Sequence, residues 1–381
     1  MDVVTALMVS VIIILLLIRF EITLAVFAGA LFLAITSAPQ SIVETLTDLS
    51  TWRIVAIVIF AFSIGYGMEV VGMLRKITDS VHSISGRFSV ALIPMLIGLL
   101  PMPGGALVSA VMIKELVDRL GISPEKAVFI NYWFRHVWVT FWPLYPNIVI
   151  AIGILSTSYS EIALSTYPIL ISSVISGMLL FGTVRGKNAG KRDLSGLAYM
   201  YPVLVIVVFA AITGDLLVAL IAAFLSIILF NRAISKISDI FRKTLDFKII
   251  VLVIGVMLYK NAIEMSNASY AFYSEVLSFS NPYVAAFSLS FLIAFATGIE
   301  LSYTSVALPL LTSFTGTGDI VNSHLFIIFL GGITGVMLSP MHLCLVFTAQ
   351  YFRARLQDVY RYLIPAVLLT VLISLPFLKV L

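Results

Sequence analysis

Two charged side chains inside long apolar segments have the clearest capacity for chemistry in this sequence. Arg135 lies in the apolar segment 126–155, and Glu300 interrupts the apolar segment 281–313. A charged side chain at the centre of a membrane helix costs about 2.5–3.5 kcal/mol, so it usually marks a substrate or ion pathway. Arg135 is a candidate clamp for a substrate carboxylate or phosphonate, and Glu300 is a candidate cation or proton site. The alternatives are an arginine that pairs or reaches toward the interface, and a carboxylate that caps the following helix.

Hydroxyl and imidazole groups lie in the same kind of segment. Ser302 and Thr304 follow Glu300, and their oxygens would help to complete the shell of a hard cation. His136 and His342 titrate near neutral pH and are candidate proton carriers. We place His136 with the coupling residues and His342 with the substrate residues. The alternative for each is a hydrogen-bonded structural histidine.

Two apolar segments are interrupted near their middle by residues that break helices. Segment 88–118 is interrupted at 101–105, and segment 281–313 is interrupted at 297–300. Each arm is roughly 20–24 Å long at 1.5 Å per residue, which is short of a hydrocarbon core of ~30 Å. We therefore expect two re-entrant hairpins. Pairs of short ordinary helices are the alternative.

Prolines interrupt two further segments. Pro143 lies in segment 126–155, and Pro340 lies in segment 323–350. Because a proline removes a backbone donor and clashes with the preceding turn, we expect unwound helix at both places, with a simple kink as the alternative. The candidate substrate-binding residues at these four breaks are Pro103, Gly104, Gly105, Arg135, Thr140, Asn147, Thr297, Gly298, Ser339 and His342. The candidate coupling residues are Glu300, Ser302, Thr304 and His136.

The composition is that of a membrane protein. Of the 381 residues, 61% are hydrophobic and 11% are charged, and the mean hydropathy is +1.11. Soluble domains have about 45–50% apolar and about 25% charged residues, so a soluble enzyme and a disordered chain are excluded. A single cysteine, Cys344, excludes an intrachain disulfide and multi-cysteine metal sites, and we expect no metal. The first apolar segment follows Met1-Asp2 without a positive region, which favours a retained helix over a signal peptide.

The apolar stretches predict an all-α polytopic protein with ten crossings besides the two hairpins. With this arrangement all but four of the 23 Lys and Arg residues fall on one side, which the positive-inside rule places in the cytoplasm. Both termini are then extracytoplasmic in a cell-membrane protein, and the basic pI near 9.0 needs no nucleic acid. The predicted crossings are 3–18, 22–37, 52–72, 126–155, 161–184, 198–213, 215–231, 247–263, 323–350 and 358–378.

The two halves of the chain, 1–195 and 196–381, align with one another. Each half has five crossings, an odd number, so the two repeats are expected to be inverted relative to each other. Inverted repeats with discontinuous helices are typical of secondary transporters, whose substrate sites lie where the helices break. The aligned pairs include 3–18 with 198–213, 101–105 with 296–300, and Pro143 with Pro340.

Motifs of soluble enzymes are missing from the sequence. There is no His-Glu-x-x-His, no Gly-x-Ser-x-Gly and no Walker-type phosphate loop. We therefore expect no enzyme activity and no dependence on ATP. A remote alternative is an intramembrane enzyme that uses Cys344 with His342, although a lone cysteine on an apolar segment usually serves packing.

The arrangement of repeats, hairpin tips and broken spans resembles the ion transporter superfamily. This superfamily includes gluconate permeases and sodium–dicarboxylate symporters, and the sequence looks most similar to a family of archaeal and bacterial integral membrane proteins. The resemblance implies a scaffold domain, a mobile transport domain with an elevator-like motion, and a homodimer. Dicarboxylate symporters of this group carry Ser-Asn-Thr at both tips. Here the tips read Pro-Met-Pro-Gly-Gly and Thr-Gly-Ile-Glu, so neither that specificity nor its sodium sites are transferred.

These observations favour a secondary active transporter of a small organic anion in the lipid bilayer, coupled to sodium or protons. Half-helices that start at the breaks would direct positive dipole ends at the substrate. A sodium/proton antiporter without an organic substrate is the alternative within the same class.

Overall fold

The computed structural model describes residues 2–17, 20–101, 105–182, 193–277 and 280–381. These residues form helices joined by turns and short loops, with no strand among them. An all-helical chain is what a bilayer requires, because lipid offers no hydrogen-bond partners to an open backbone. The predicted fold class is confirmed at this level.

The elements follow one another in the same order in the two halves, although their relation by an inverted symmetry stays a prediction. The first half contains α1 (Val3–Leu17), α2 (Ile22–Ser37), α3 (Gln40–Thr47), α4 (Leu49–Val70), α5 (Met73–Ser85), η1 (Gly86–Phe88), α6 (Ser89–Ile97), α7 (Gly105–Arg119), α8 (Pro124–His136), α9 (Pro146–Leu155) and α10 (Tyr159–Phe181). The second half contains η2 (Ser195–Met200), α11 (Tyr201–Thr213), α12 (Leu216–Phe230), η3 (Ile234–Lys236), α13 (Ile237–Thr244), α14 (Phe247–Met265), α15 (Ala268–Leu277), α16 (Pro282–Thr297), α17 (Glu300–Ser302), the π-helix η4 (Tyr303–Ala307), α18 (Leu308–Leu310), α19 (Thr312–Thr315), α20 (Asn322–Leu338), α21 (Leu343–Phe352), α22 (Leu356–Ser374) and η5 (Leu375–Lys379).

Helix lengths support fewer unbroken crossings than the ten predicted. Within the described residues, six helical stretches are long and apolar enough to cross a bilayer, and α14 with α15, bent by 72°, would make a seventh. Helices α1, α2 and α12 have 15, 16 and 15 residues. At 1.5 Å per residue each spans roughly 22–24 Å, less than the ~30 Å of a hydrocarbon core. Their apolar composition predicted crossings that their lengths alone do not support.

The first interrupted segment folds as a helix, a break and a second helix. Helix α6 ends at Ile97 and α7 begins at Gly105. The first arm is longer than predicted, because α5, η1 and α6 make one apolar stretch of 25 residues, Met73–Ile97. Residues 73–87 lie outside every crossing and hairpin that the sequence predicted. These residues are helical because Met73, Ile77 and Val81 form a buried face, which the basic residues between them obscure in the sequence.

The second interrupted segment breaks where the sequence predicted it. Helix α16 ends at Thr297, and Gly298 follows with a left-handed φ of 63°, a conformation that glycine adopts without steric cost. Glu300 then begins α17. The second arm is irregular, since α17, the π-helix η4, α18 and α19 succeed one another within sixteen residues, 300–315.

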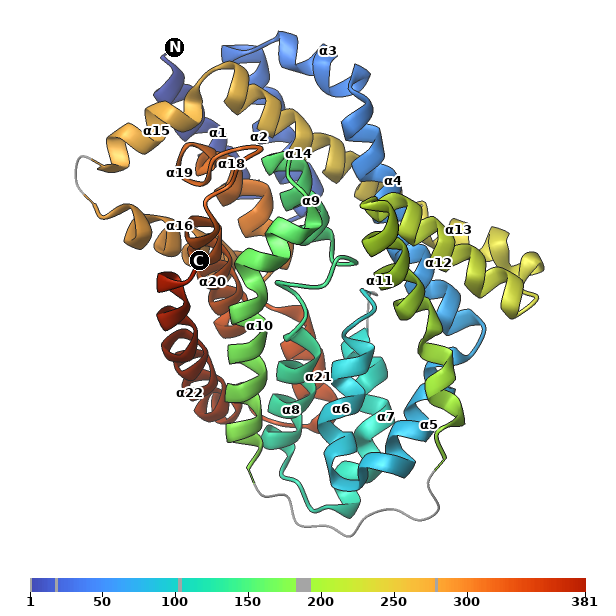
Figure 1. Ribbon diagram of the computed structural model, residues 1–381. Helices are drawn as coiled ribbons and strands as arrows, with labels where there is room; N and C mark the ends of the chain where they lie inside the picture. Colours follow the sequence, from blue (N-terminus) through green and yellow to red (C-terminus); the bar gives the residue numbers. More distant parts are fainter. Residues whose placement is uncertain (1, 18–19, 102–104, 183–192, 278–279) are drawn as a thin grey trace.

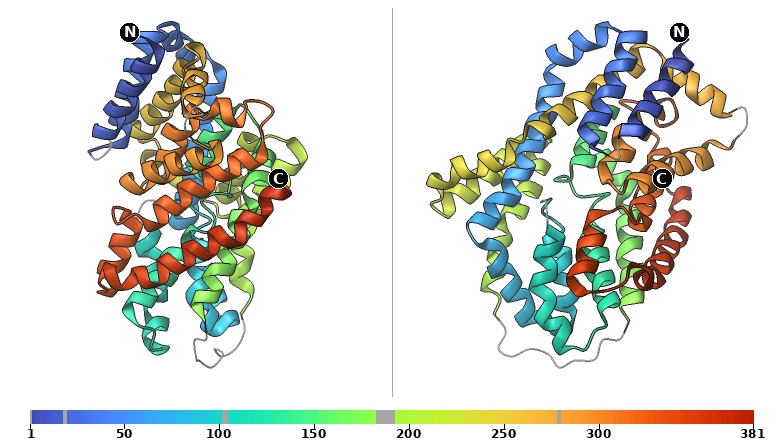
Figure 2. Two further views of the ribbon diagram at one scale, coloured as in Figure 1. Left: turned by 90° about the vertical axis from the view of Figure 1, so that its left-hand side faces the viewer. Right: turned by 180° about the vertical axis from the view of Figure 1, so that it is seen from behind.

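The two proline-containing spans are also broken. Residues 137–145 separate α8 from α9, and residues 339–342 separate α20 from α21. Pro146 is the first residue of α9, a position where the missing N–H has no helical partner to lose. Figures 1 and 2 place α8, α21, α6 and α7 side by side, with α20, α10 and α22 next to them and α11–α13 on the opposite flank.

Glycines let the second hairpin approach α20 closely. A Cβ atom on Gly331 would lie 2.4 Å from the Phe287 carbonyl oxygen of α16, and one on Gly332 would lie 2.4 Å from the Tyr303 ring of η4. Small residues are the usual means by which membrane helices come into close contact. The hairpin is thereby fixed against a broken span.

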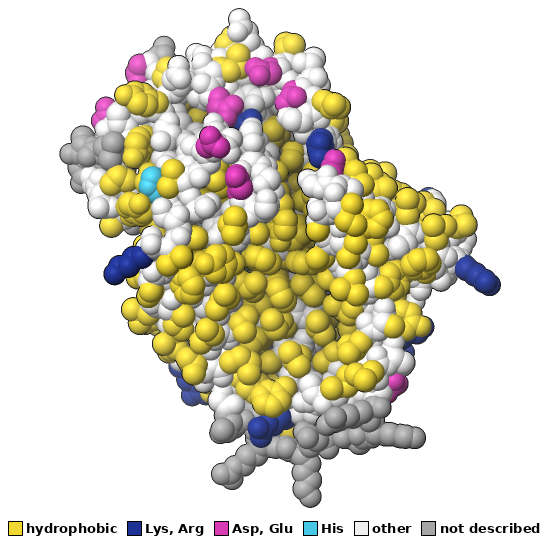
Figure 3. All heavy atoms as spheres, viewed as in Figure 1, with side chains coloured by type: hydrophobic (Ala, Val, Ile, Leu, Met, Phe, Trp, Pro, Cys, Tyr) yellow, Lys and Arg dark blue, Asp and Glu magenta, His cyan; other side chains and the backbone are white. Residues whose placement is uncertain are grey.

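The surface has the distribution expected of a protein that spans a membrane. Figure 3 shows a broad band of hydrophobic side chains around the middle of the molecule, and most of the Asp and Glu side chains visible there lie at one end of it. Large apolar side chains such as Leu204, Ile212 and Leu229 are more than 60% exposed, which suits lipid and not water.

Close packing at Gly98 should be necessary for stability. A Cβ atom there would lie 2.3 Å from the Arg135 carbonyl oxygen, whereas the nearest neighbour of one on Gly65 would be the Pro101 carbonyl oxygen, at 3.5 Å. We expect Gly98→Ala to lower the free energy of unfolding by about 1–3 kcal/mol through overpacking. The matched variant Gly65→Ala should change it by less than ~0.5 kcal/mol. Thermal unfolding of the purified protein in detergent measures both, and equal stabilities would contradict the packing argument.

Candidate functional site

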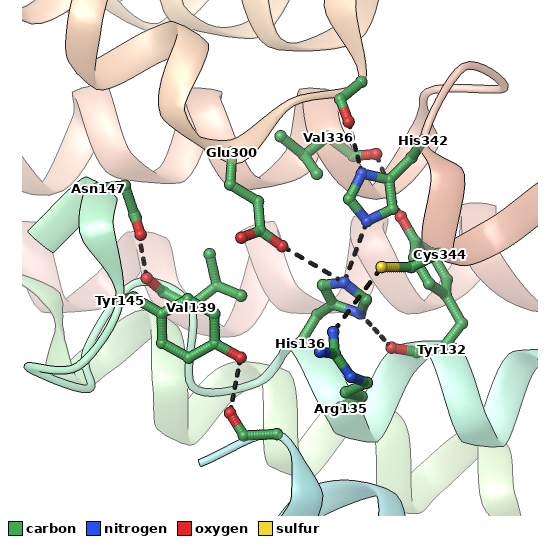
Figure 4. A network of polar contacts seen from close by, with 12 residues as sticks. Tyr132, Arg135, His136, Val139, Tyr145, Asn147, Glu300, Val336, His342 and Cys344 are labelled. Carbon is green, nitrogen blue, oxygen red and sulfur yellow. Dashed lines mark hydrogen bonds and ion pairs between the residues drawn. The ribbon is translucent and has the colours of Figure 1, made fainter. Parts of the chain in front are cut away.

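Residues from three breaks form one cluster, which we call the central cluster: Arg135, His136, Glu300, His342 and Cys344 (Figure 4). Arg135, His136 and His342 are buried, and Glu300 and Cys344 are half-buried. Arg135 and His136 are the last residues of α8, and Glu300 is the first residue of α17. His342 precedes α21, and Cys344 lies in its first turn. The cluster therefore joins the two halves of the chain.

Two histidines of the central cluster are held by backbone carbonyl groups. His136 donates from Nδ1 to the Tyr132 carbonyl oxygen at 2.6 Å, and His342 donates from Nδ1 to the Gly298 carbonyl oxygen at 2.5 Å. Their Nε2 atoms face each other at 3.1 Å. The His342 bond ties the α20–α21 break to the tip of the second hairpin.

Glu300 completes the histidine pair. Its Oε1 atom lies 3.3 Å from Nε2 of His136, whose side chain is fully buried, while the Glu300 side chain is 17% exposed. Figure 4 shows the carboxylate directed from the hairpin tip toward the imidazole. The carboxylate is thus the most accessible part of this contact.

Arg135 is buried beside the only sulfur atom of a cysteine in the chain. The residue is 4% exposed, and its Nη1 donates to Sγ of Cys344 at 3.8 Å. Burial of a guanidinium is costly unless hydrogen bonds and opposite charges compensate it. Glu300, on the neighbouring hairpin tip, supplies the opposite charge within the same cluster.

Side chains of the α8–α9 break satisfy backbone groups. The Tyr145 hydroxyl donates to the Gly98 carbonyl oxygen at 2.6 Å, so this break is joined to the end of α6. Asn147 donates from Nδ2 to the Val139 carbonyl oxygen at 2.9 Å and to the Tyr303 hydroxyl at 3.1 Å. Both amide hydrogens of Asn147 therefore have protein partners, and its Oδ1 atom is buried without one.

The hydroxyl groups near Glu300 are likewise engaged within the protein. Thr297 donates to the Ser302 hydroxyl at 2.7 Å, and Ser302 donates to the Ile299 carbonyl oxygen at 2.7 Å. Thr304 donates to the Leu301 carbonyl oxygen at 3.1 Å. These contacts close the hairpin tip. Each hydroxyl group uses its hydrogen in them, so only its oxygen lone pairs remain available to a ligand.

The predicted site residues occupy different positions relative to the central cluster. Arg135, His136, Glu300 and His342 lie within it, and Gly298 contacts it through its carbonyl group. Ser339 instead donates to the Phe295 carbonyl oxygen at 2.7 Å, which ties α16 to the α20–α21 break. Gly105 begins α7, and Thr140 is buried in the α8–α9 break. Pro103 and Gly104 lie outside the described residues.

Cys344 is the site residue that sequence reasoning undervalued. The sequence favours a packing role for this residue, because it is a lone cysteine on an apolar segment. The available signal was its position two residues after His342, beside a predicted break. Tyr132 was also missed; its hydroxyl donates to the Val336 carbonyl oxygen at 3.2 Å, and its ring centroid lies 4.6 Å from that of His136.

The fold and this site define a polytopic, all-helical membrane protein with the fold of a transporter. The crystal structure of the YdaH transporter of Alcanivorax borkumensis matches with a TM-score of 0.63 over 98% of each chain, at 12% sequence identity. The chain belongs to the family described as protein of unknown function (DUF401), whose model matches residues 2–381. No curated protein sequence matched the chain. These findings support a transporter fold but not a specific kinship with gluconate permeases or dicarboxylate symporters.

The contacts of Asn147 predict a graded loss of stability. Asn147→Ala leaves the Val139 carbonyl and the Tyr303 hydroxyl without this buried donor, whereas Tyr303→Phe removes only one of the two bonds. A buried polar group without a partner costs about 1–3 kcal/mol. We expect thermal unfolding in detergent to show a larger loss for Asn147→Ala than for Tyr303→Phe. The opposite order would show that Asn147 does not hold the break.

Proposed function

We propose that this protein is a secondary active transporter of a small organic anion, coupled to sodium ions or protons. The observation that carries the proposal is the meeting of the second hairpin and both broken spans around one group of charged and titratable side chains, with the end of α6 joined to the α8–α9 break by the Tyr145–Gly98 bond. Backbone that leaves the helical conformation at membrane depth persists where it is buried in protein or lines a polar cavity. Helix breaks that meet in one place are typical of transporter substrate sites.

The charge of Arg135 supports an anion as the substrate. Its guanidinium offers several donors in a planar fork that matches a carboxylate. Two ten-residue helices, α9 and α21, begin beside the breaks, and a helix N-terminus attracts negative charge. The donors of Asn147, in contrast, are occupied, so we assign it to positioning the break and not to direct substrate contact.

Glu300 supports the coupling of transport to a cation. Its carboxylate is the accessible anionic group of the central cluster, at 17% exposure, and it lies at the tip of a hairpin. A cation bound there would offset the carboxylate and free Arg135 to hold the substrate. Sodium and a proton both meet this requirement, and Ser302 and Thr304 would add oxygen ligands for sodium.

The packing of helices suggests which parts would move. Helices α1, α2 and α14 pack together, as do α4, α12 and α13. Helix α4 also contacts α14, so these six helices make a first group. A second group consists of α6, α7, α8 and α21, packed together, with α10, α16, α20 and α22 beside them. We infer that the second group, which carries both hairpins, moves as a transport domain against the first in an elevator-like motion. The transporter fold shared with YdaH supports alternating access in general.

Uptake into proteoliposomes tests the proposal. We expect radiolabelled acetate, succinate, citrate or gluconate to accumulate when a sodium or pH gradient is imposed, and not without a gradient. Arg135→Gln should raise the KM of the transported anion at least tenfold, since it removes the charged donor. The absence of gradient-dependent flux across this panel would contradict an organic-anion transporter. A pH change on adding sodium alone would instead indicate sodium/proton exchange.

Glu300 should be required for coupling. Glu300→Gln removes the charge and keeps the size of the side chain, so we expect gradient-driven uptake to fall at least tenfold. Glu264→Gln is a matched control, because Glu264 does not belong to the central cluster. Its side chain is 38% exposed, and its Oε2 atom lies 3.6 Å from Nζ of Lys260. Gradient dependence that is unchanged in Glu300→Gln would assign Glu300 to capping the hairpin helix.

A further inference from the structure

We propose that His136, His342 and Cys344, with Glu300 in a fourth position, form a binding site for a thiophilic transition-metal ion of the Zn²⁺ class. The sequence predicted no metal, because a single cysteine excludes multi-cysteine metal sites. The site goes beyond the proposed transport, since metal binding is measured on the purified protein without any flux.

The distances fit a single metal ion. One nitrogen of each histidine and the sulfur of Cys344 all lie within 4.8 Å of one another. The two Nε2 atoms are 3.1 Å apart. A tetrahedral zinc ion holds histidine nitrogens at about 2.0–2.1 Å, which places two such nitrogens roughly 3.3 Å from each other. The histidines are therefore already spaced as ligands of one ion.

The hydrogen bonds of the histidines identify which nitrogens face the ion. A carbonyl oxygen only accepts, so the Nδ1 bonds of both histidines require a proton on Nδ1. In neutral imidazole the Nε2 atom then carries a lone pair, and here two such lone pairs face each other. Metal-binding histidines are oriented in the same way, with the other ring nitrogen donating to a carbonyl group or a carboxylate.

A third electron-pair donor points at the same place. Oε1 of Glu300 lies 3.3 Å from Nε2 of His136, so two nitrogen lone pairs and a carboxylate meet without a hydrogen between them when both histidines are neutral. This arrangement is repulsive unless a cation lies among the three groups. A shared proton would join two of these atoms, whereas a metal ion with four ligands joins all of them.

The sulfur of Cys344 selects a soft ion over sodium, magnesium or calcium. Thiolate and imidazole ligands suit Zn²⁺ and copper, while hard cations prefer carboxylate, carbonyl and water oxygens. The thiolate is the form of cysteine that binds metal, and the Arg135 guanidinium beside the sulfur compensates its negative charge. The two histidines are 2% and 5% exposed, which keeps water out of the ligand sphere.

Cobalt(II) binding to the purified full-length protein tests the site. The protein is prepared in detergent without a polyhistidine tag, treated with a chelator, and titrated with Co²⁺. We expect one ion per chain, a near-ultraviolet charge-transfer band from sulfur to cobalt, and displacement by one equivalent of Zn²⁺. Cys344→Ser should abolish the charge-transfer band. His136→Gln and His342→Gln should each weaken binding at least tenfold.

His324→Gln is the matched control, and it should bind Co²⁺ like the unaltered protein. His324 also donates from Nδ1 to a carbonyl oxygen, that of Phe314 at 2.5 Å, but its Nε2 faces the Tyr283 hydroxyl at 3.1 Å. Because the unaltered protein carries the primary result, a variant that fails to fold leaves the test intact.

Three results would overturn the proposal: no sulfur-to-cobalt band in the unaltered protein, an unchanged band in Cys344→Ser, or equal affinity in the protein lacking both His136 and His342. The first would leave a shared proton as the occupant of the histidine pair. None of them bears on gradient-driven uptake, so failure of the metal site and failure of the proposed transport are distinguishable.

Discussion

The pairing of backbone groups at four helix breaks is the constraint on which the rest of this structure depends. A carbonyl group left open at membrane depth finds no water or lipid donor, so the protein itself must supply one. Tyr145 supplies it to Gly98, His342 to Gly298, and Ser339 to Phe295. Each of these bonds runs from a broken span to a hairpin. The breaks therefore hold one another in place.

This constraint separates two kinds of polar residue that the sequence presents alike. Asn147 and Ser302 donate their hydrogen bonds to the protein backbone or to a neighbouring hydroxyl group. His136 and His342 donate to the backbone only from Nδ1, and their Nε2 atoms are directed at each other. The groups left over after the backbone is satisfied are the ones available for a ligand. By this criterion the nitrogen and sulfur donors of the site belong to the central cluster, and the hydroxyl-rich turn after Glu300 adds only oxygen lone pairs.

Local sequence predicted the breaks well, because their causes are local. Gly298 provides the positive φ that ends α16, and Pro146 begins α9 at a position that tolerates the missing N–H. The extension of the first hairpin back to Met73 was missed, because the charges of an amphipathic helix resemble those of a loop. The contact of Arg135 with Cys344 could not be predicted from either residue. It depends on how two breaks, 209 residues apart in the chain, are joined by the bonds described above.

The charges of the central cluster connect its two proposed ligands. With a divalent ion bound, the thiolate of Cys344 and the carboxylate of Glu300 balance the ion, and Arg135 retains one positive charge that a monovalent anion would neutralise. Without the ion and with a neutral thiol, Arg135 and Glu300 balance each other, and an incoming anion brings an excess negative charge into a buried site. That excess is costly at low dielectric, so the anion then requires an accompanying cation. Under these two proposals the Glu300 carboxylate would distinguish the two cases. With a metal ion bound to it, the site would accept an anion alone; with the carboxylate free, anion binding would require a coupling cation.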